Sequence, residues 1–279
     1  MSLGVSKIGI LQGRVIPERI DKLQLFPILN WKKEFIEIQD IGFDCVELLF
    51  DKKLVFEKAL FDFDGLNSFN DALIKAKNLR LGSICADYFS TISLISAKTQ
   101  KLFYEYVLKF INLARSISIE VVVIPFFDKN IITATRDLEY VLSWIKKQGI
   151  DEIAVEHNVV LSIESNLSAR QIKNAFSGYQ FRNVKICYDL GNAKALGYNP
   201  EEEILVLREL INHVHIKDCK VNGPNVMLGK GDVDFNACFK VLKQIDYAGL
   251  MILETGYFND PSSEALENLV FVKKILESI

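Results

Sequence analysis

Short apolar runs recur along the whole chain and alternate with longer amphipathic segments. Each run is largely apolar in its interior, which is typical of strands covered on both faces of a parallel sheet. Runs of this kind, separated by helical segments, predict parallel strands joined by crossover helices. Eight such runs are found, at Lys7–Leu11, Asp44–Phe50, Leu81–Ala86, Glu120–Phe126, Val159–Glu164, Val184–Asp189, His213–Lys217 and Leu250–Glu254.

The number of predicted strands favours an α/β fold of the closed (β/α)8 type, the TIM barrel. The 279 residues fit one such barrel, and no linker or low-complexity stretch divides them. A single domain over residues 1–279 is therefore expected. A doubly wound open sheet has the same alternation, but its dinucleotide-binding form is disfavoured. Leu11-Gln12-Gly13-Arg14, and not a GxGxxG motif, follows the first run.

The segments between the runs carry the signals of helices. Asn30, Ser168, Asn199 and Asp260 stand where helices are expected to begin; Ser168 is followed by Gln171, and Asn199 and Asp260 each precede a proline. Between residues 99 and 116, apolar side chains recur at helical spacing and predict a helix that packs on the strands. They are Leu102, Phe103, Tyr106, Val107, Phe110, Ile111 and Ala114.

Composition and charge narrow the class of protein. Hydrophobic residues at 49% and charged residues at 25% exclude a disordered chain. A net charge of -3 and a pI near 5.8 provide no basic footprint, so nucleic acid is not an expected partner. The five cysteines are scattered without a CxxC pair, which disfavours a disulfide framework or a zinc knuckle. With no membrane-length apolar run and no signal core, a cytoplasmic protein without a membrane partner is expected.

Candidate chemistry gathers at the ends of four consecutive predicted strands. Glu164, Asp189 and Glu254 each end a run, and His215 lies within the seventh. In a closed barrel the carboxyl ends of the strands form the active face. Buried carboxylates without partners are costly, and a divalent metal is the simplest way to satisfy three of them and an imidazole. Such a ligand set suits Mn²⁺ or Mg²⁺ and tolerates Co²⁺ or Zn²⁺. A helix cap or salt bridge is the alternative for any single member.

Other polar residues each allow two interpretations. Arg14 could clamp a phosphate or carboxylate, or pair with a neighbouring acid. His213 shares the barrel-facing side of its strand with His215 and is interpreted as a buried partner of the ligands. His157 precedes its strand and is interpreted as solvated. Gly229 and Gly231, around Lys230, could let backbone N–H groups approach an anion, or form an ordinary turn.

Several segments resemble the xylose-isomerase-like TIM barrels, which include sugar phosphate isomerases and epimerases. The resemblance spans nearly the whole chain, and its most diagnostic segments are His-Ile-Lys-Asp and Gly-Lys-Gly-Asp-Val-Asp. It is densest in Leu161–Asn166, Tyr188–Asn192, His213–Asp218, Leu228–Asp234 and Leu253–Thr255.

The resemblance implies that Glu164, Asp189, His215 and Glu254 match one divalent metal site, with Glu164 and Glu254 also the acid/base pair. Asn192 and Lys217 match positions that face the substrate, although many members carry a histidine where Asn192 stands. Glu47 matches a polar pocket position; a salt bridge to a neighbouring strand is the alternative.

The expected activity is isomerisation or epimerisation of a small sugar or sugar phosphate. A metal would stabilise the enediolate left by proton removal, and two carboxylates could exchange the proton. Two alternatives stay open, dehydration of a cyclic polyol and a non-catalytic sugar-binding barrel. An endonuclease of the same broad family is disfavoured, because its zinc site needs more histidines than the three present. The sequence leaves the substrate, the metal and a possible homo-oligomer undecided.

Overall fold

Eight parallel strands close into a barrel in the computed structural model, which describes residues 7–16, 24, 26–27, 29–51, 71, 74–76, 79–256 and 259–279. The strands follow the order β1-β10-β7-β6-β5-β4-β3-β2, so the last strand closes on the first. The predicted (β/α)8 fold is confirmed, with each strand within a residue or two of its predicted bounds. The strands are β1 (Ile8–Leu11), β2 (Cys45–Leu49), β3 (Arg80–Cys85), β4 (Val121–Pro125), β5 (Val160–Glu164), β6 (Val184–Asp189), β7 (Ile211–Ile216) and β10 (Leu250–Leu253).

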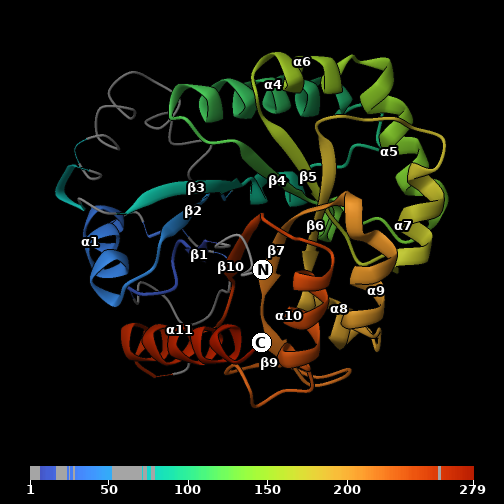
Figure 1. The fold of residues 1–279 in the computed structure, drawn as a ribbon. Helices are drawn as coiled ribbons and strands as arrows, with labels where there is room; N and C mark the ends of the chain where they lie inside the picture. Colours follow the sequence, from blue (N-terminus) through green and yellow to red (C-terminus); the bar gives the residue numbers. More distant parts are fainter. Residues whose placement is uncertain are drawn as a thin grey trace.

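Helices form an outer layer around the strands (Figure 1). The α-helices are α1 (Trp31–Ile41), α4 (Gln100–Ser116), α5 (Thr135–Lys147), α6 (Ile150–Glu156), α7 (Ala169–Phe176), α8 (Leu190–Ala195), α9 (Pro200–Leu207), α10 (Phe235–Gln244) and α11 (Pro261–Ser278). Short 3₁₀ helices are η1 (Asp87–Thr91), η2 (Asp128–Asn130) and η3 (Arg208–Leu210). None of the helices in the described part of the chain is long and apolar enough for a membrane span.

The four predicted helix starts are all N-cap positions, but their side chains act differently. Ser168 and Gln171 form a reciprocal capping box at α7, and Asp260 accepts a hydrogen bond from the backbone N–H of Ser263 at α11. The side chains of Asn30 and Asn199 make no capping hydrogen bond. Local sequence therefore placed these helix boundaries correctly, whether or not the capping bond forms.

The predicted stripe on α4 packs inward with one exception. Phe103, Val107, Phe110 and Ile111 are buried, whereas Leu102 is 37% exposed. Leu102 precedes Phe103 by one residue and is therefore rotated about a third of a turn away from the buried stripe. The inclusion of Leu102 in that stripe was wrong.

Among the residues that the structure describes, the apolar core forms two separate clusters. The larger lies between the strands and the surrounding helices. The smaller contains Leu11, Cys45, Leu49, Cys85 and Ile252. Alternation along a strand places Cys45 and Leu49 on the same face of β2 as Glu47, whose side chain crosses to β7. The small cluster therefore lies inside the barrel.

The long connection after β7 contains a hairpin that the sequence analysis did not predict. Strands β8 (Asp218–Cys219) and β9 (Asn225–Val226) pair antiparallel. The Asp218 carboxylate accepts hydrogen bonds from the backbone N–H groups of Gly229 (2.9 Å), Gly231 (2.8 Å) and Val233 (3.3 Å). A Cβ on Gly231 would lie 1.9 Å from an Asp218 oxygen. The anion that the glycine N–H groups approach is therefore the chain's own Asp218.

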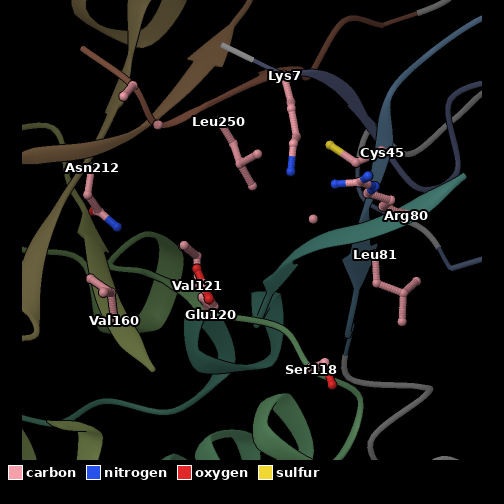
Figure 2. A pocket seen from close by; sticks show the side chains of 13 residues that line it. Lys7, Cys45, Arg80, Leu81, Ser118, Glu120, Val121, Val160, Asn212 and Leu250 are labelled. Carbon is pink, nitrogen blue, oxygen red and sulfur yellow. The ribbon is translucent and has the colours of Figure 1, made fainter. Parts of the chain in front are cut away.

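The amino-terminal end of the barrel, opposite the candidate ligands, contains a cavity of about 520 Å³ (Figure 2). Its wall is formed where the strands begin and includes Lys7, Cys45, Arg80 and Asn212. Cys45 fits between β1 and β3 because Gly9 lies beside it on β1 and Gly82 on β3.

Candidate metal and proton-transfer site

Four buried side chains converge at the carboxyl end of the barrel. Glu164 and Asp189 end β5 and β6, His215 lies near the end of β7, and Glu254 follows β10. Their candidate ligand atoms all lie within 4.8 Å of one another. Because β5, β6, β7 and β10 are consecutive in the barrel, Glu164 and Glu254 flank the other two. We call these four residues the ligand ring.

Glu47 fixes the orientation of His215 from across the barrel. Its Oε1 lies 2.9 Å from His215 Nε2, and its Oε2 lies 2.8 Å from His213 Nε2 and accepts a hydrogen bond from Ser83 at 2.6 Å. Burial would raise the pKa of Glu47, but His215 and His213 outweigh it and hold the pKa well below its ordinary value. With Nε2 engaged, His215 presents Nδ1 to the other members of the ring.

The donor set fits a divalent cation. His215 Nδ1 and Asp189 Oδ2 are buried, and each meets a charged side chain of the site, Glu254 for the imidazole nitrogen and Lys217 for the carboxylate oxygen. Glu254 Oε2 lies 2.9 Å from His215 Nδ1, and Glu164 Oε1 lies 3.7 Å from the same atom. Three carboxylates and one imidazole suit a cation that prefers oxygen with some nitrogen. A histidine held by a carboxylate on its other nitrogen is a common partner of such ions.

Lys217 and Asn192, the two positions that the resemblance places toward the substrate, lie against the ring. Lys217 Nζ lies 2.8 Å from Asp189 Oδ2 and 3.2 Å from Glu254 Oε2. Asn192 donates from Nδ2 to Glu164 Oε1 at 3.3 Å, and its backbone N–H donates to Asp189 Oδ1 at 2.8 Å. Both side chains therefore contact the ring directly.

Arg14 contacts the ring from the loop after β1. Its Nη2 lies 3.9 Å from Glu254 Oε1 and donates to Gln24 Oε1 at 2.9 Å, while the Gln24 amide donates to Glu254 Oε1. Glu34 Oε1 on α1 accepts hydrogen bonds from the backbone N–H groups of Gly13 (2.8 Å) and Val15 (3.4 Å), on either side of Arg14. Glu34 therefore holds the loop that carries Arg14.

The two glutamates of the ring differ in how fully their oxygens are engaged. Glu254 faces Lys217 and His215 through Oε2 and Arg14 through Oε1. Burial would raise its pKa, but the attraction of Lys217 and His215 outweighs it and lowers the pKa well below its ordinary value. Burial dominates at Glu164 and raises its pKa. The protein therefore shifts the pKa values of the two glutamates in opposite directions.

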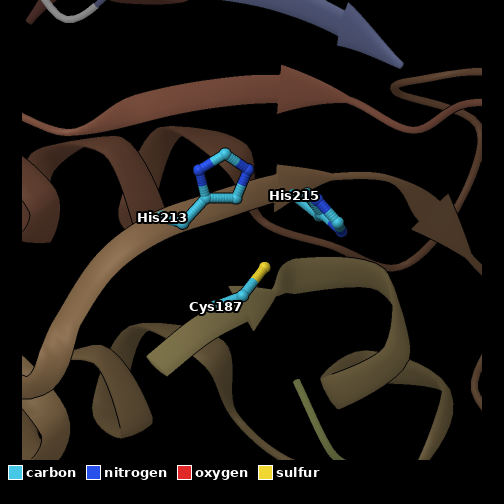
Figure 3. Close-up of side chains that lie close together, drawn as sticks. All are labelled: Cys187, His213 and His215. Carbon is cyan, nitrogen blue, oxygen red and sulfur yellow. The ribbon is translucent and has the colours of Figure 1, made fainter. Parts of the chain in front are cut away.

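The remaining histidines lie outside the ring. His213 is fully buried beneath His215, as predicted. The thiol of Cys187 on β6 faces the imidazoles of both His213 and His215 (Figure 3). His157 is half-buried at the end of α6, with Nδ1 3.0 Å from the carbonyl oxygen of Ile153. The expectation that His157 is solvated was therefore only partly right.

Sequence reasoning missed Gln24, Ser83, Glu34 and Asp87. Asp87 directly follows the predicted apolar run Leu81–Ala86, two residues after β3 ends, so the strand-end signal that identified the ring could have found it. Burial raises its pKa to about 7, with Glu254 adding to the effect. Gln24, Ser83 and Glu34 have hydrogen-bond partners that are distant in sequence, so no local motif marks them.

The chain belongs to the xylose isomerase-like TIM barrel family, whose model matches residues 35–275. Among curated relatives, L-ribulose-5-phosphate 3-epimerase UlaE of Salmonella heidelberg (strain SL476) is 27% identical over 265 residues, covering 89% of this chain and 90% of the relative.

Solved structures show the same fold at lower sequence identity. A xylose isomerase-like TIM barrel protein from Mycobacterium smegmatis, in complex with magnesium, has a TM-score of 0.75 at 16% identity and covers 100% of this chain and 99% of its own. The apo form of 3-keto-D-glucoside 4-epimerase YcjR from E. coli has a TM-score of 0.71 at 18% identity, covering 96% and 99%.

Proposed function

We propose that the protein is a divalent-metal-dependent epimerase of a small ketose or ketose phosphate. The observation that carries the proposal is the pair Glu164 and Glu254 at the two ends of one buried ligand ring. The epimerase names of the relatives support the same class of reaction. Isomerisation between aldose and ketose needs the same groups and differs only in the carbon that receives the proton.

Glu164, Asp189, His215 and Glu254 would hold one ion, Mn²⁺ or Mg²⁺ by the preference of the donor set, with Co²⁺ or Zn²⁺ tolerated. Bound there, the ion would act as a Lewis acid that stabilises negative charge on substrate oxygens. Glu47 would keep His215 in the tautomer that leaves Nδ1 free to ligate.

Proton transfer would fall to the two glutamates. A proton on the carbon next to a carbonyl can be removed by one carboxylate and returned by another on the opposite face, which inverts that carbon. Glu164 and Glu254 approach from β5 and β10, with two strands between them. This separation supports action from two sides of one bound sugar.

Three polar residues beside the ring would contact the rest of the substrate. Lys217 and Arg14 are the buried cations nearest the ring carboxylates and would bind substrate oxygens or an anionic end. Asn192 contacts Glu164 and is a donor for a sugar hydroxyl. The Glu47 carboxylate lies beneath His215 and engages His213 and Ser83, which favours an orienting role for it over direct substrate contact.

A screen of free ketoses, aldoses and their phosphates in D2O, followed by NMR, tests the proposal. The protein stripped with EDTA is expected to be inactive, and Mn²⁺ or Mg²⁺ is expected to restore activity. The product should be an epimer carrying one solvent deuterium at the inverted carbon. Loss of water from the substrate, or activity that survives metal removal, would contradict the assignment.

A further inference from the structure

The cavity at the amino-terminal end of the barrel has two cations on its wall and lies at the end opposite the ligand ring. Lys7 precedes β1 and Arg80 begins β3, and both are exposed to solvent. Within the part of the chain that the structure describes, neither side chain has an acidic group within ion-pair distance. The nearby Asp44 carboxylate accepts the backbone N–H of Ile8 at 2.9 Å.

The cavity opens because two neighbouring strands diverge. Strands β3 and β4 pair only at Ile84 with Val122 and at Cys85 with Val123. By contrast, β2 pairs with β3, and β4 with β5, at five positions each. Leu81 and Gly82 on one side and Glu120 and Val121 on the other therefore face the cavity and not each other.

The polar groups of the cavity are divided between two sides. Figure 2 shows Lys7 and Arg80 near Cys45, with Asn212 and Glu120 toward the other side. Lysine and arginine together suit a phosphate group, and an amide with a carboxylate suits hydroxyl groups. A volume of about 520 Å³ accommodates a small ligand.

We propose that this cavity is a second binding site, for a small phosphate monoester that also carries hydroxyl groups. Lys7 and Arg80 bind the phosphate, and Asn212 and Glu120 bind the hydroxyl groups. The site is separate from the ligand ring, since its lining residues lie at the opposite ends of the same strands. Its existence does not depend on the reaction proposed for the ring.

Titration of the ¹⁵N-labelled full chain with glycerol 3-phosphate, inorganic phosphate and glycerol tests the site. Glycerol 3-phosphate is expected to shift the amide signals of Gly82 and Gly249, with weaker binding of phosphate and none of glycerol. Signals near the ring, such as Gly191, report separately on binding there. If only the ring signals move, or if glycerol binds as well as its phosphate, the proposal is overturned.

Charge-matched variants test the two cations. Lys7→Met and Arg80→Met should each weaken glycerol 3-phosphate binding at Gly82 roughly tenfold or more, since each removes a charge-assisted hydrogen bond. Lys240→Met on α10 and Arg170→Met on α7 remove the same charges from exposed positions elsewhere. Equal weakening in all four variants would mean general charge attraction and would overturn the site.

Discussion

At the scale of single residues, Glu34 links stability to pH. Its carboxyl is completely buried, one oxygen accepts the N–H groups of Gly13 and Val15, and Oε2 makes no hydrogen bond within the described residues. Burial raises its pKa from the ordinary 4.5 to about 8, although the N–H donors and Arg14 act in the opposite direction. The folded chain therefore keeps a proton on Glu34 that the unfolded chain releases.

Glu34 should make the protein less stable as pH rises from about 4.5 to about 8, because the folded state binds more protons in this range. Glu34→Gln keeps the acceptor oxygen but cannot ionise. We expect the free energy of unfolding of the wild type to fall relative to that of the variant across this range. Urea unfolding at pH 5 and pH 8.5 measures the difference, and parallel curves would contradict the account.

Glu47 permits a test of the support beneath the ring. Glu47→Gln keeps the size of the side chain but removes the charge that faces His215 and His213. Loss of such a partner typically weakens metal binding by about 10- to 100-fold. Calorimetric titration with Mn²⁺ measures the change, with Glu139→Gln as a control at an exposed carboxylate. An unchanged affinity would show that His215 does not depend on Glu47.

The ligand ring could be predicted because its members share one simple property, a polar residue at the end of an apolar strand. Asp87 has that property too and was overlooked. Gln24 could not be found in this way, since its contact with Glu254 joins residues 230 positions apart. The contact forms only when barrel closure places β1, and the segment that follows it in sequence, next to β10.

At the scale of elements, the connection after β7 is organised around one buried carboxylate. Asp218 accepts the N–H groups of Gly229, Gly231 and Val233, and this arrangement closes the loop beneath the β8–β9 hairpin. The strands of this hairpin are two residues long, too short to show a periodic pattern in the sequence. The two glycines could be recognised in the sequence, but Asp218 could not be recognised as the acceptor of their N–H groups.

Gly231→Ala should destabilise the protein by about 1–3 kcal/mol, because the added Cβ would lie 1.9 Å from Asp218. Gly178→Ala is the matched control, since its Cβ would meet nothing within 4 Å. We expect the control to change stability by less than about 0.5 kcal/mol. Chemical unfolding of both variants measures the contrast, and equal stabilities would disprove the packing argument.

At the scale of the whole molecule, periodicity predicted eight strands but could not distinguish a closed barrel from an open sheet. Closure is established by the pairing of β1 with β10, where Ile10 aligns with Leu253. This contact joins the two ends of the chain and has no local sequence signal. The strand-end residues supported closure indirectly, because they form a compact ring only when the strands surround a common axis.

We propose that the chain unfolds as one domain and that metal binding stabilises all of it. Mn²⁺ at about a hundred times its dissociation constant should add about 2.7 kcal/mol, or roughly 5 to 10 °C in Tm, to a single transition. Asp189→Asn should lose most of this shift, while Lys240→Met should retain it. Two separate transitions, or equal shifts in all three proteins, would contradict the proposal.

The central claim is that Glu164 and Glu254 transfer the proton as well as hold the metal. The most direct measurement is solvent deuterium wash-in at the substrate carbon, made at saturating metal for Glu164→Gln and Glu254→Gln separately. Each substitution should lower kcat by roughly a hundredfold or more relative to the wild type. One variant is expected to exchange the proton of one epimer without turning it over, and the other to do so for the opposite epimer. Turnover at the wild-type rate in both variants would show that these carboxylates are not the proton-transfer groups.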